Sequence, residues 1–363
     1  MTIVSVIVTL LIFSLIVVVH EYGHFIAARK NGILVEEFAV GMGPILLSRK
    51  KGDTLYSIRA FPLGGFCKML GEEDGDTSDS RSFSSKTVWQ RIVVCLAGVV
   101  MNFLLAVVLG CILISITGIS STVVKEVFDG YPAQTAGLMP GDKIIKINGK
   151  NVLVYEYIGL YLRAGDGNTV EVTFERAGDK ITVPITPYAV PLEGGYVNYY
   201  IGVGVERKAG FFASEKSDFQ TVGLAEMVKG AFGKSVFYVS ATFDSLSQLF
   251  RQKVKVDDLR GPIGMGQIVD MGLQAAVEQK ESQVISFLSF VIDMAMLLSA
   301  NLAVMNLLPI PAIDGGRIVF LIIEGVRRRP VDPDKEGLVH LIGFALVIGL
   351  AIFVAFNDIR RIF

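Results

Sequence analysis

Four long apolar runs limit what this chain can fold into more than any other feature of its sequence. The first run, residues 3–19, contains no charged residue, and after a short polar segment its apolar character continues to residue 28. A helix needs about 20 apolar residues to cross a bilayer, so we expect residues 3–28 to form the first membrane span. Three later runs are also long enough, at residues 92–117, 284–310 and 338–356.

Composition and charge agree with an integral membrane protein. Hydrophobic residues make up 52% of the chain and charged residues only 19%, whereas soluble domains carry about 25% charged residues. The net charge of −1 gives no case for a nucleic-acid partner. The three cysteines show neither a metal nor a disulfide spacing.

No Lys or Arg precedes Arg29, so the first span does not resemble a cleaved signal peptide and should stay in the mature protein.

The distribution of Lys and Arg predicts how the spans are oriented. These residues are concentrated between the first two spans and between the last two. Because cytoplasmic loops carry the excess of positive charge, both connections should be cytoplasmic, which places the N-terminus and residues 118–283 outside. Arg360 and Arg361 then lie on the wrong side, a minor conflict in a short tail.

The outer segment contains a small β-rich domain, which we place at residues 120–208. Alternating residues at 170–174 and 181–185 predict half-buried strands. Residues 131–149 combine a short helix, a Gly-Asp turn and a strand ending in Asn-Gly, and resemble the same stretch of bacterial PDZ domains. PDZ domains bind peptides by strand addition. A spacer of similar build is the alternative.

A second β-prone segment, residues 54–70, lies close to the first span and contains a hairpin-like turn at residues 62–65. Apolar strands this near a span suggest a loop that dips into the bilayer. Unpaired backbone is tolerated there only when protein buries it or when it lines a watery cavity. We therefore expect a membrane-reentrant β-loop.

Residues 20–24, within the first span, read HEYGH and match the HExxH pattern. On a helix, His20 and His24 share one face, so both imidazoles can bind one zinc ion while Glu21 reaches its water. A buried histidine pair that only holds helices together is the alternative. Ionisable groups at membrane depth are costly and are usually functional, which favours the metal site.

A hydrolytic zinc site usually has three protein ligands, so a third must come from elsewhere. His340 starts the fourth span without matching neighbours, whereas Asp314 follows the third span in NLLPIPAIDGGR, residues 306–317. At 1.5 Å per residue, His20 lies about 26 Å along its helix from residue 3, near the cytoplasmic side. The third span descends to the same side, which favours Asp314 as the ligand. A helix terminus with a turn is the alternative.

Together, HEYGH, the PDZ-like insert and NLLPIPAIDGG resemble the site-2 protease family of intramembrane zinc metalloproteases. The bacterial, PDZ-containing, RseP-like branch is the most similar, and the resemblance covers essentially the whole chain, including GPIG at residues 261–264. It implies a membrane α-helical fold with four transmembrane helices, a membrane-reentrant β-loop and one extracytoplasmic PDZ-like α+β domain. The departures are small: residues 312–313 are Ala-Ile where Val-Leu or similar is common, and only one PDZ-like domain fits.

The expected domains follow from these motifs. They are residues 1–119 with the first two spans, the HExxH motif and the reentrant loop, residues 120–208 with the PDZ-like domain, residues 209–283 with an amphipathic linker, and residues 284–363 with the last two spans and the Asp-containing motif.

The resemblance also implies roles for individual residues. It assigns His20, His24 and Asp314 as ligands of Zn²⁺, with Glu21 as the catalytic base. Asn306 matches the family's asparagine near the scissile carbonyl. The reentrant loop would hold an unwound substrate as an added strand.

The implied substrates are single-span proteins of the bacterial inner membrane that another protease has already shortened. Membrane-bound anti-sigma factors are the leading class and remnant signal peptides the second. The PDZ-like domain would exclude uncut proteins by size or recognise a new C-terminus. We favour size exclusion, because residues 200–203 match a carboxylate-binding loop only weakly.

Two other classes of function remain open from the sequence. One is a catalytically silent, membrane-anchored PDZ scaffold with a structural zinc, which would have no need of Glu21. The other is a transporter that uses intramembrane acids such as Asp293 as a relay, but four spans without an evident repeat fit that class poorly. The sequence assigns no firm role to Asp293 or His340.

Overall fold

Four helices account for the apolar runs of the sequence. Each is long and apolar enough to cross a membrane, and the described part of the chain contains four such helices. This finding confirms the prediction of a membrane protein with four candidate spans. The helices are α1 (Ile3–Lys30), α2 (Val88–Thr117), α7 (Gln283–Leu307) and α9 (Pro333–Ile362).

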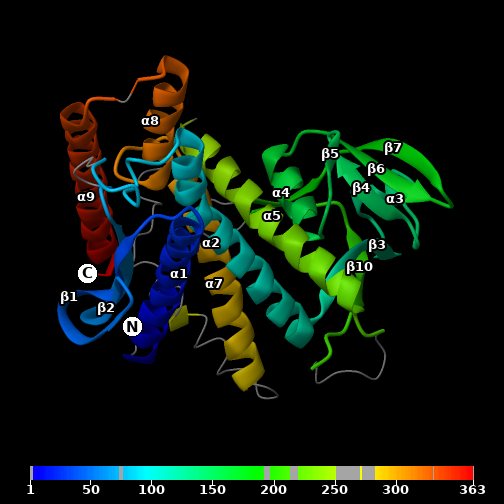
Figure 1. The fold of residues 1–363 in the computed structure, drawn as a ribbon. Helices are drawn as coiled ribbons and strands as arrows, with labels where there is room; N and C mark the ends of the chain where they lie inside the picture. The colour runs from blue at the N-terminus through cyan, green and yellow to red at the C-terminus, as the bar shows by residue number, and fades with distance from the viewer. Residues whose placement is uncertain are drawn as a thin grey trace. The chain divides into compact units, whose positions relative to one another are not determined.

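The computed structural model describes residues 3–72, 77–191, 197–212, 220–250, 270–271, 283–329 and 331–362. The chain divides into two units, one made of Met1–Ala106 with Thr242–Phe363 and the other of Val107–Ala241 (Figure 1). Helix α2 and helix α5 (Leu224–Phe250) each contribute to both units. The GPIG motif at residues 261–264 lies outside the described residues.

Small residues allow α1 and α2 to pack closely. A Cβ atom at Gly23 of α1 would lie 2.4 Å from the carbonyl oxygen of Ala97 on α2. Such contacts are typical of membrane helices, where small side chains let two backbones approach. The close approach matters because the HEYGH segment lies on this part of α1.

The first connection folds into a β-sheet made of β1 (Val35–Lys51) and β2 (Thr54–Met69). Val40 in β1 pairs with Ile58 and also with Gly65, both in β2. Two parts of β2, around Ile58 and around Gly65, therefore lie on opposite sides of Val40. The chain reverses between these two parts, where the turn at residues 62–65 was predicted. The sheet lies beside α1 in Figure 1.

One end of this sheet exposes large apolar side chains instead of burying them. A soluble protein would cover such a cluster or use it as a binding surface. The exposed residues are Met42, Ile45, Leu46, Leu47, Ile58 and Phe61.

The end of the third apolar run differs from the prediction. The expected span reached residue 310, but α7 ends at Leu307 and a separate helix, α8 (Asp314–Arg327), follows. Pro309 and Pro311 cannot donate a backbone hydrogen bond, so they stop α7. The sequence predicts only a turn here and does not indicate α8, because this helix is too short to be a span.

The first turn of α8 packs directly against the segment that precedes it. A Cβ atom at Gly315 would lie 2.0 Å from the carbonyl oxygen of Leu308, and one at Gly316 would lie 2.4 Å from that of Ile310. Any larger residue would collide with the backbone at both positions. The two glycines therefore fix how α8 starts and where its first residue, Asp314, lies.

The second unit contains a mixed α and β domain. Its sheet has the strand order β10-β3-β4-β6-β7, with β5 beside β4, and β8 pairs separately with β9. Strands β6 (Val170–Arg176) and β7 (Asp179–Ile185) are the two strands predicted from alternation. Its other elements are β3 (Ile119–Val127), α3 (Pro132–Thr135), β4 (Lys143–Ile147), β5 (Lys150–Asn151), α4 (Glu156–Ala164), β8 (Tyr188–Pro191), β9 (Val197–Tyr200) and β10 (Val203–Lys208).

This domain has its own hydrophobic core. Phe174, Ile144 and Leu162 are among its most deeply buried side chains. An insert with its own buried core is expected to fold as a unit. The prediction of a sheet-containing domain is therefore confirmed.

Candidate metal centre

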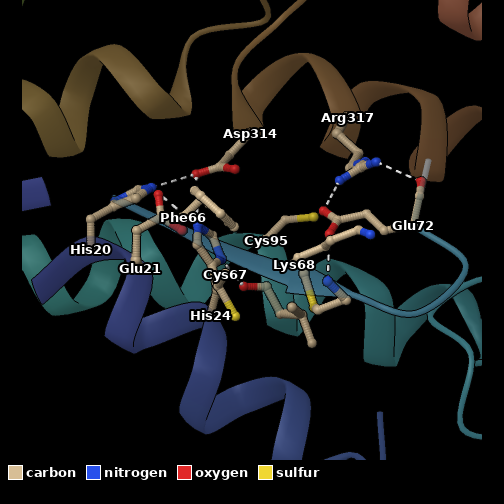
Figure 2. Close-up of a pocket in the computed structure, with 12 residues that line it drawn as sticks. His20, Glu21, His24, Phe66, Cys67, Lys68, Glu72, Cys95, Asp314 and Arg317 are labelled. Carbon is tan, nitrogen blue, oxygen red and sulfur yellow. Dashed lines mark hydrogen bonds and ion pairs between the residues drawn. The ribbon is translucent and has the colours of Figure 1, made fainter. Parts of the chain in front are cut away.

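Three potential ligand atoms converge where α1 meets the start of α8. The Nε2 atoms of His20 and His24 are 3.1 Å apart. The Oδ2 atom of Asp314 lies 3.0 Å from Nε2 of His20 and 3.4 Å from Nε2 of His24. Figure 2 shows Asp314 reaching from α8 toward the residues of α1. The structure thus brings together three residues that the sequence singled out.

These distances suit a zinc ion. Bonds of about 2.0–2.2 Å in tetrahedral geometry place neighbouring ligand atoms about 3.3 Å apart, close to the spacings between the three atoms. Both histidines are buried. Within the described chain, Oδ2 of Asp314 is buried and faces no polar partner other than the imidazole nitrogens. His20, His24 and Asp314 therefore fit a three-ligand zinc site.

The carboxyl group of Asp314 is held in its ionised form. Burial alone would raise its pKa, but in the metal-free protein the neighbouring imidazoles of His20 and His24 outweigh burial and keep the pKa below its usual range. A metal-binding carboxylate has to be deprotonated. The surroundings of Asp314 therefore match that requirement.

A backbone hydrogen bond orients His24. Its Nδ1 atom lies 2.9 Å from the carbonyl oxygen of Val94 on α2. A carbonyl can only accept, so Nδ1 carries the proton and the lone pair of Nε2 points toward the cluster. Metal-binding histidines commonly use this arrangement.

Two asparagine side chains lie against the ring of His20. The amide nitrogen of Asn102 on α2 lies 3.2 Å from Nδ1 of His20, and that of Asn306 on α7 lies 3.2 Å from Nε2. Asn102 is completely buried, and its Oδ1 has no partner within the described chain. If Nε2 is the ligand atom, Nδ1 carries the proton, and an amide turned to present Oδ1 would accept it.

Asn102 and its neighbour Gly98 were not recognised from the sequence. Both lie on one face of α2, four residues apart, and a Cβ atom at Gly98 would lie 2.5 Å from Cε1 of His20. The signal that could have found Asn102 is a lone amide in an uncharged membrane span, because such side chains commonly bond across helices.

Glu21 lines the pocket beside the three ligand atoms. The cavity has a volume of about 520 Å³ and is bordered by α1, β2, α2 and α8 (Figure 2). A Cβ atom at Gly65 of β2 would lie 3.9 Å from Cγ of Glu21. The edge of the β1–β2 sheet therefore lies directly beside Glu21.

Two cysteines line the same pocket but are not part of the cluster. Among the described residues, one group of three or more metal-ligating side chains is close enough to share an ion, and it is His20, His24 and Asp314. Burial raises the pKa of the Cys67 thiol, which disfavours the thiolate form that metals bind. An ion pair between Arg317 of α8 and Glu72 lines another part of the pocket.

The two acid–base residues without a role lie elsewhere. His340 on α9 is outside the metal-ligating group but contacts the backbone of Ala312, two residues before Asp314. Asp293 is half-buried in α7 and does not line the pocket.

Comparison with known proteins identifies the family. The model of peptidase family M50 matches residues 8–350. The chain belongs to peptidase family M50. Zinc metalloprotease RasP of Geobacillus kaustophilus is 30% identical to this M50 peptidase over 100% of this chain and 99% of its own length. RasP of Shouchella clausii is 30% identical over 97% and 98%. A Clostridium perfringens relative, named only provisionally as a zinc metalloprotease, is 37% identical over 96% and 97%.

Family membership confirms the enzyme class predicted from the sequence. The M50 peptidase is a zinc-dependent metalloendopeptidase of the site-2 protease type, and it is a membrane protein. This assignment disfavours the scaffold and transporter alternatives.

Proposed function

We propose that the enzyme cuts peptide bonds inside membrane-spanning segments, with His20, His24 and Asp314 as the zinc ligands. The observation that carries this proposal is the convergence of the two Nε2 atoms and Oδ2 within 3.4 Å of one another, in a pocket that Glu21 also lines. Zinc, when bound, supplies the Lewis acid that activates a water molecule and polarises the scissile carbonyl.

The protein's own residues complete the chemistry. Glu21 accepts a proton from the attacking water and delivers it to the leaving amine. Asn306, whose amide lies 3.2 Å from His20, donates a hydrogen bond to the substrate backbone or to the developing oxyanion. His24 and His20 are held in place by Val94 and Asn102 and do not move protons.

The sheet of β1 and β2 would bind the substrate. A transmembrane helix shields its carbonyl groups with its own hydrogen bonds, so it must unwind before it can be cut. Adding the unwound segment as a strand beside residues 65–69 of β2 would replace the lost bonds. The exposed apolar end of the sheet supports insertion of this loop into the bilayer.

The site would face the cytoplasmic side of the membrane. The distribution of Lys and Arg supports cytoplasmic connections between the first two and the last two spans. In that orientation the sheet-containing insert is extracytoplasmic and can meet substrates before they reach the pocket.

The proposed substrates are shortened single-span proteins, with anti-sigma factors first and remnant signal peptides second. The insert, which we take to be PDZ-like, would exclude uncut proteins by size. An apolar groove of about 320 Å³ between α4 and residues 199–203 offers the alternative, binding of a new C-terminus. Removal of residues 121–206 should allow uncut substrates to be cleaved, and their continued resistance would contradict the filter.

The central experiment compares the wild-type protein with Glu21→Gln in detergent. Both are incubated with a single-span model substrate, and their bound zinc is measured. We expect near-equal zinc and a loss of cleavage of roughly 10²–10⁴-fold in the variant. Zinc with equal cleavage in both proteins would remove Glu21 as the base. No zinc in either would overturn the metal site.

A further inference from the structure

His340, the third histidine of the chain, is bonded to the turn that carries Asp314. Its Nδ1 atom accepts a hydrogen bond from the backbone N–H of Ala312 at 2.9 Å. Ala312 lies two residues before Asp314 and belongs to the loop between α7 and α8. A side chain on α9 thus fixes the backbone that presents the third ligand.

Ala312 needs such a fixed partner because its backbone conformation is unfavourable. Its φ angle is +82°, a value that residues with a side chain rarely adopt. Conformations of this kind persist only where the surroundings impose them. A turn held in this way would relax if its hydrogen bond were lost, and Asp314 would move with it.

The rest of α9 presses on the same turn. A Cβ atom at Gly343 would lie 2.4 Å from Cβ of Pro311 and 2.6 Å from its carbonyl oxygen. Gly343 lies one helical turn after His340, on the same face of α9. The imidazole also packs against Phe320 of α8 in a tilted arrangement, with ring centroids 5.5 Å apart. Only 6% of the α9 span is buried. The face of α9 that carries His340 and Gly343 therefore provides much of the contact between α9 and the rest of its own unit.

We propose that His340 is a positioning residue for the zinc site, acting through the Ala312 N–H to hold Asp314 in place. This inference rests on the proposed function, in which Asp314 is a zinc ligand. The required property is a hydrogen-bond acceptor at the position of Nδ1. The opposite ring nitrogen, Nε2, lies 3.8 Å from Glu336 and is not needed for this role.

Asn and Leu make a matched pair of substitutions for the test. Both side chains branch at Cγ, and Asn places an oxygen near the position of Nδ1 while Leu places a methyl group there. His340→Asn can keep the bond to Ala312, whereas His340→Leu cannot. Glu336→Gln, on the same face of α9, is the control for a change beside the imidazole that leaves the bond intact.

The measured quantity is the rate at which the zinc-loaded, full-length protein loses zinc to an excess of chelator in detergent. We expect His340→Leu to lose zinc about tenfold faster, the usual effect of removing a group that supports a metal ligand. His340→Asn should restore most of the wild-type rate, and Glu336→Gln should match wild type. Thermal unfolding of the zinc-free proteins shows whether each variant is folded. Faster zinc loss from His340→Leu than from His340→Asn, with similar thermal unfolding of the two variants, supports the proposal.

Equal rates for His340→Asn and His340→Leu would overturn the role of His340. Failure of the proposed function would look different: Asp314→Ala would then retain zinc as firmly as wild type. If Asp314→Ala loses zinc while the two His340 variants behave alike, only the inference about His340 falls.

Discussion

Gly98 of α2 lies so close to His20 of α1 that a Cβ atom at Gly98 would sit 2.5 Å from Cε1 of the imidazole. The same atom would lie 2.6 Å from Nε2 of His24. Both rings are already held by bonds to α2, so they cannot move aside freely. Position 98 therefore shapes the metal site although it provides no ligand.

We expect Gly98→Ala to weaken zinc binding at least about tenfold, because the added methyl group displaces one or both imidazoles. Gly349→Ala in α9 is the matched control, since a Cβ there meets no atom within 4 Å. Competition with a chelator in detergent measures the affinity. Equal affinities in the two variants would contradict the crowding of the histidines by residue 98.

Asn102 should support zinc binding through His20. Asn102→Leu keeps the shape of the side chain but removes the oxygen that would accept the Nδ1 proton, so we expect a loss of affinity of about 10–100-fold. Asn102→Asp retains an oxygen and should lose less. The same chelator competition tests both variants, and equal losses would show that only packing at position 102 matters.

The exposed end of the β1–β2 sheet should lie in lipid. A cysteine introduced at Leu47, which is 67% exposed, should react slowly with a membrane-impermeant maleimide in inside-out vesicles. A cysteine at Asp53, at the opposite, charged end of the sheet, should react several-fold faster, and detergent should remove the difference. Rapid labelling at Leu47 in intact vesicles would place this end of the sheet in water.

Acid should destabilise the sheet-containing insert through Asp142. Burial would raise the pKa of this carboxyl, but two hydrogen bonds of 2.7 Å from Arg176 and one of 2.8 Å from the N–H of Met139 lower it. A lowered folded-state pKa stabilises the fold above the unfolded pKa of about 3.9, and this contribution is lost as the pH falls through the folded value.

The acid-induced loss of stability can be followed with a cysteine introduced at Val172, which is completely buried in the folded insert. This cysteine becomes accessible to a reagent when the insert unfolds. Between about pH 3 and about pH 7, labelling with a pyridyl disulfide, a reagent that still reacts with thiols in acid, should increase steeply only at the acidic end. Asp142→Asn should label faster at neutral pH and show a flatter acid dependence. An unchanged acid dependence in that variant would remove Asp142 as its source.

Much of the architecture followed from short-range patterns. The four spans were predictable because a bilayer demands long apolar helices, and the HEYGH spacing placed His20 and His24 on one face because a helix repeats every 3.6 residues. Placing Asp314 near the two histidines required an argument from topology. That argument predicted the side of the membrane but not the distances between the ligand atoms. The substrate, the orientation in the membrane and the PDZ-like character of the insert remain predictions.

Other parts could not be predicted because they depend on contacts between distant segments. Helix α8 is too short to be recognised as a span, and its start is set by the packing of Gly315 and Gly316 on the preceding backbone. Asn102 looked like one residue of an apolar run until α2 placed it against His20. His340 appeared isolated until α9 brought it to Ala312.

The sequence by itself determined that the chain enters a membrane and carries paired histidines with an adjacent glutamate, since both depend on periodicity within single helices. Only the tertiary structure decided which groups hold those histidines and Asp314 at 3.0–3.4 Å. The physical reason is that hydrogen bonds and steric fit act over a few ångströms between α1, α2, α8 and α9, and distance along the chain does not encode them.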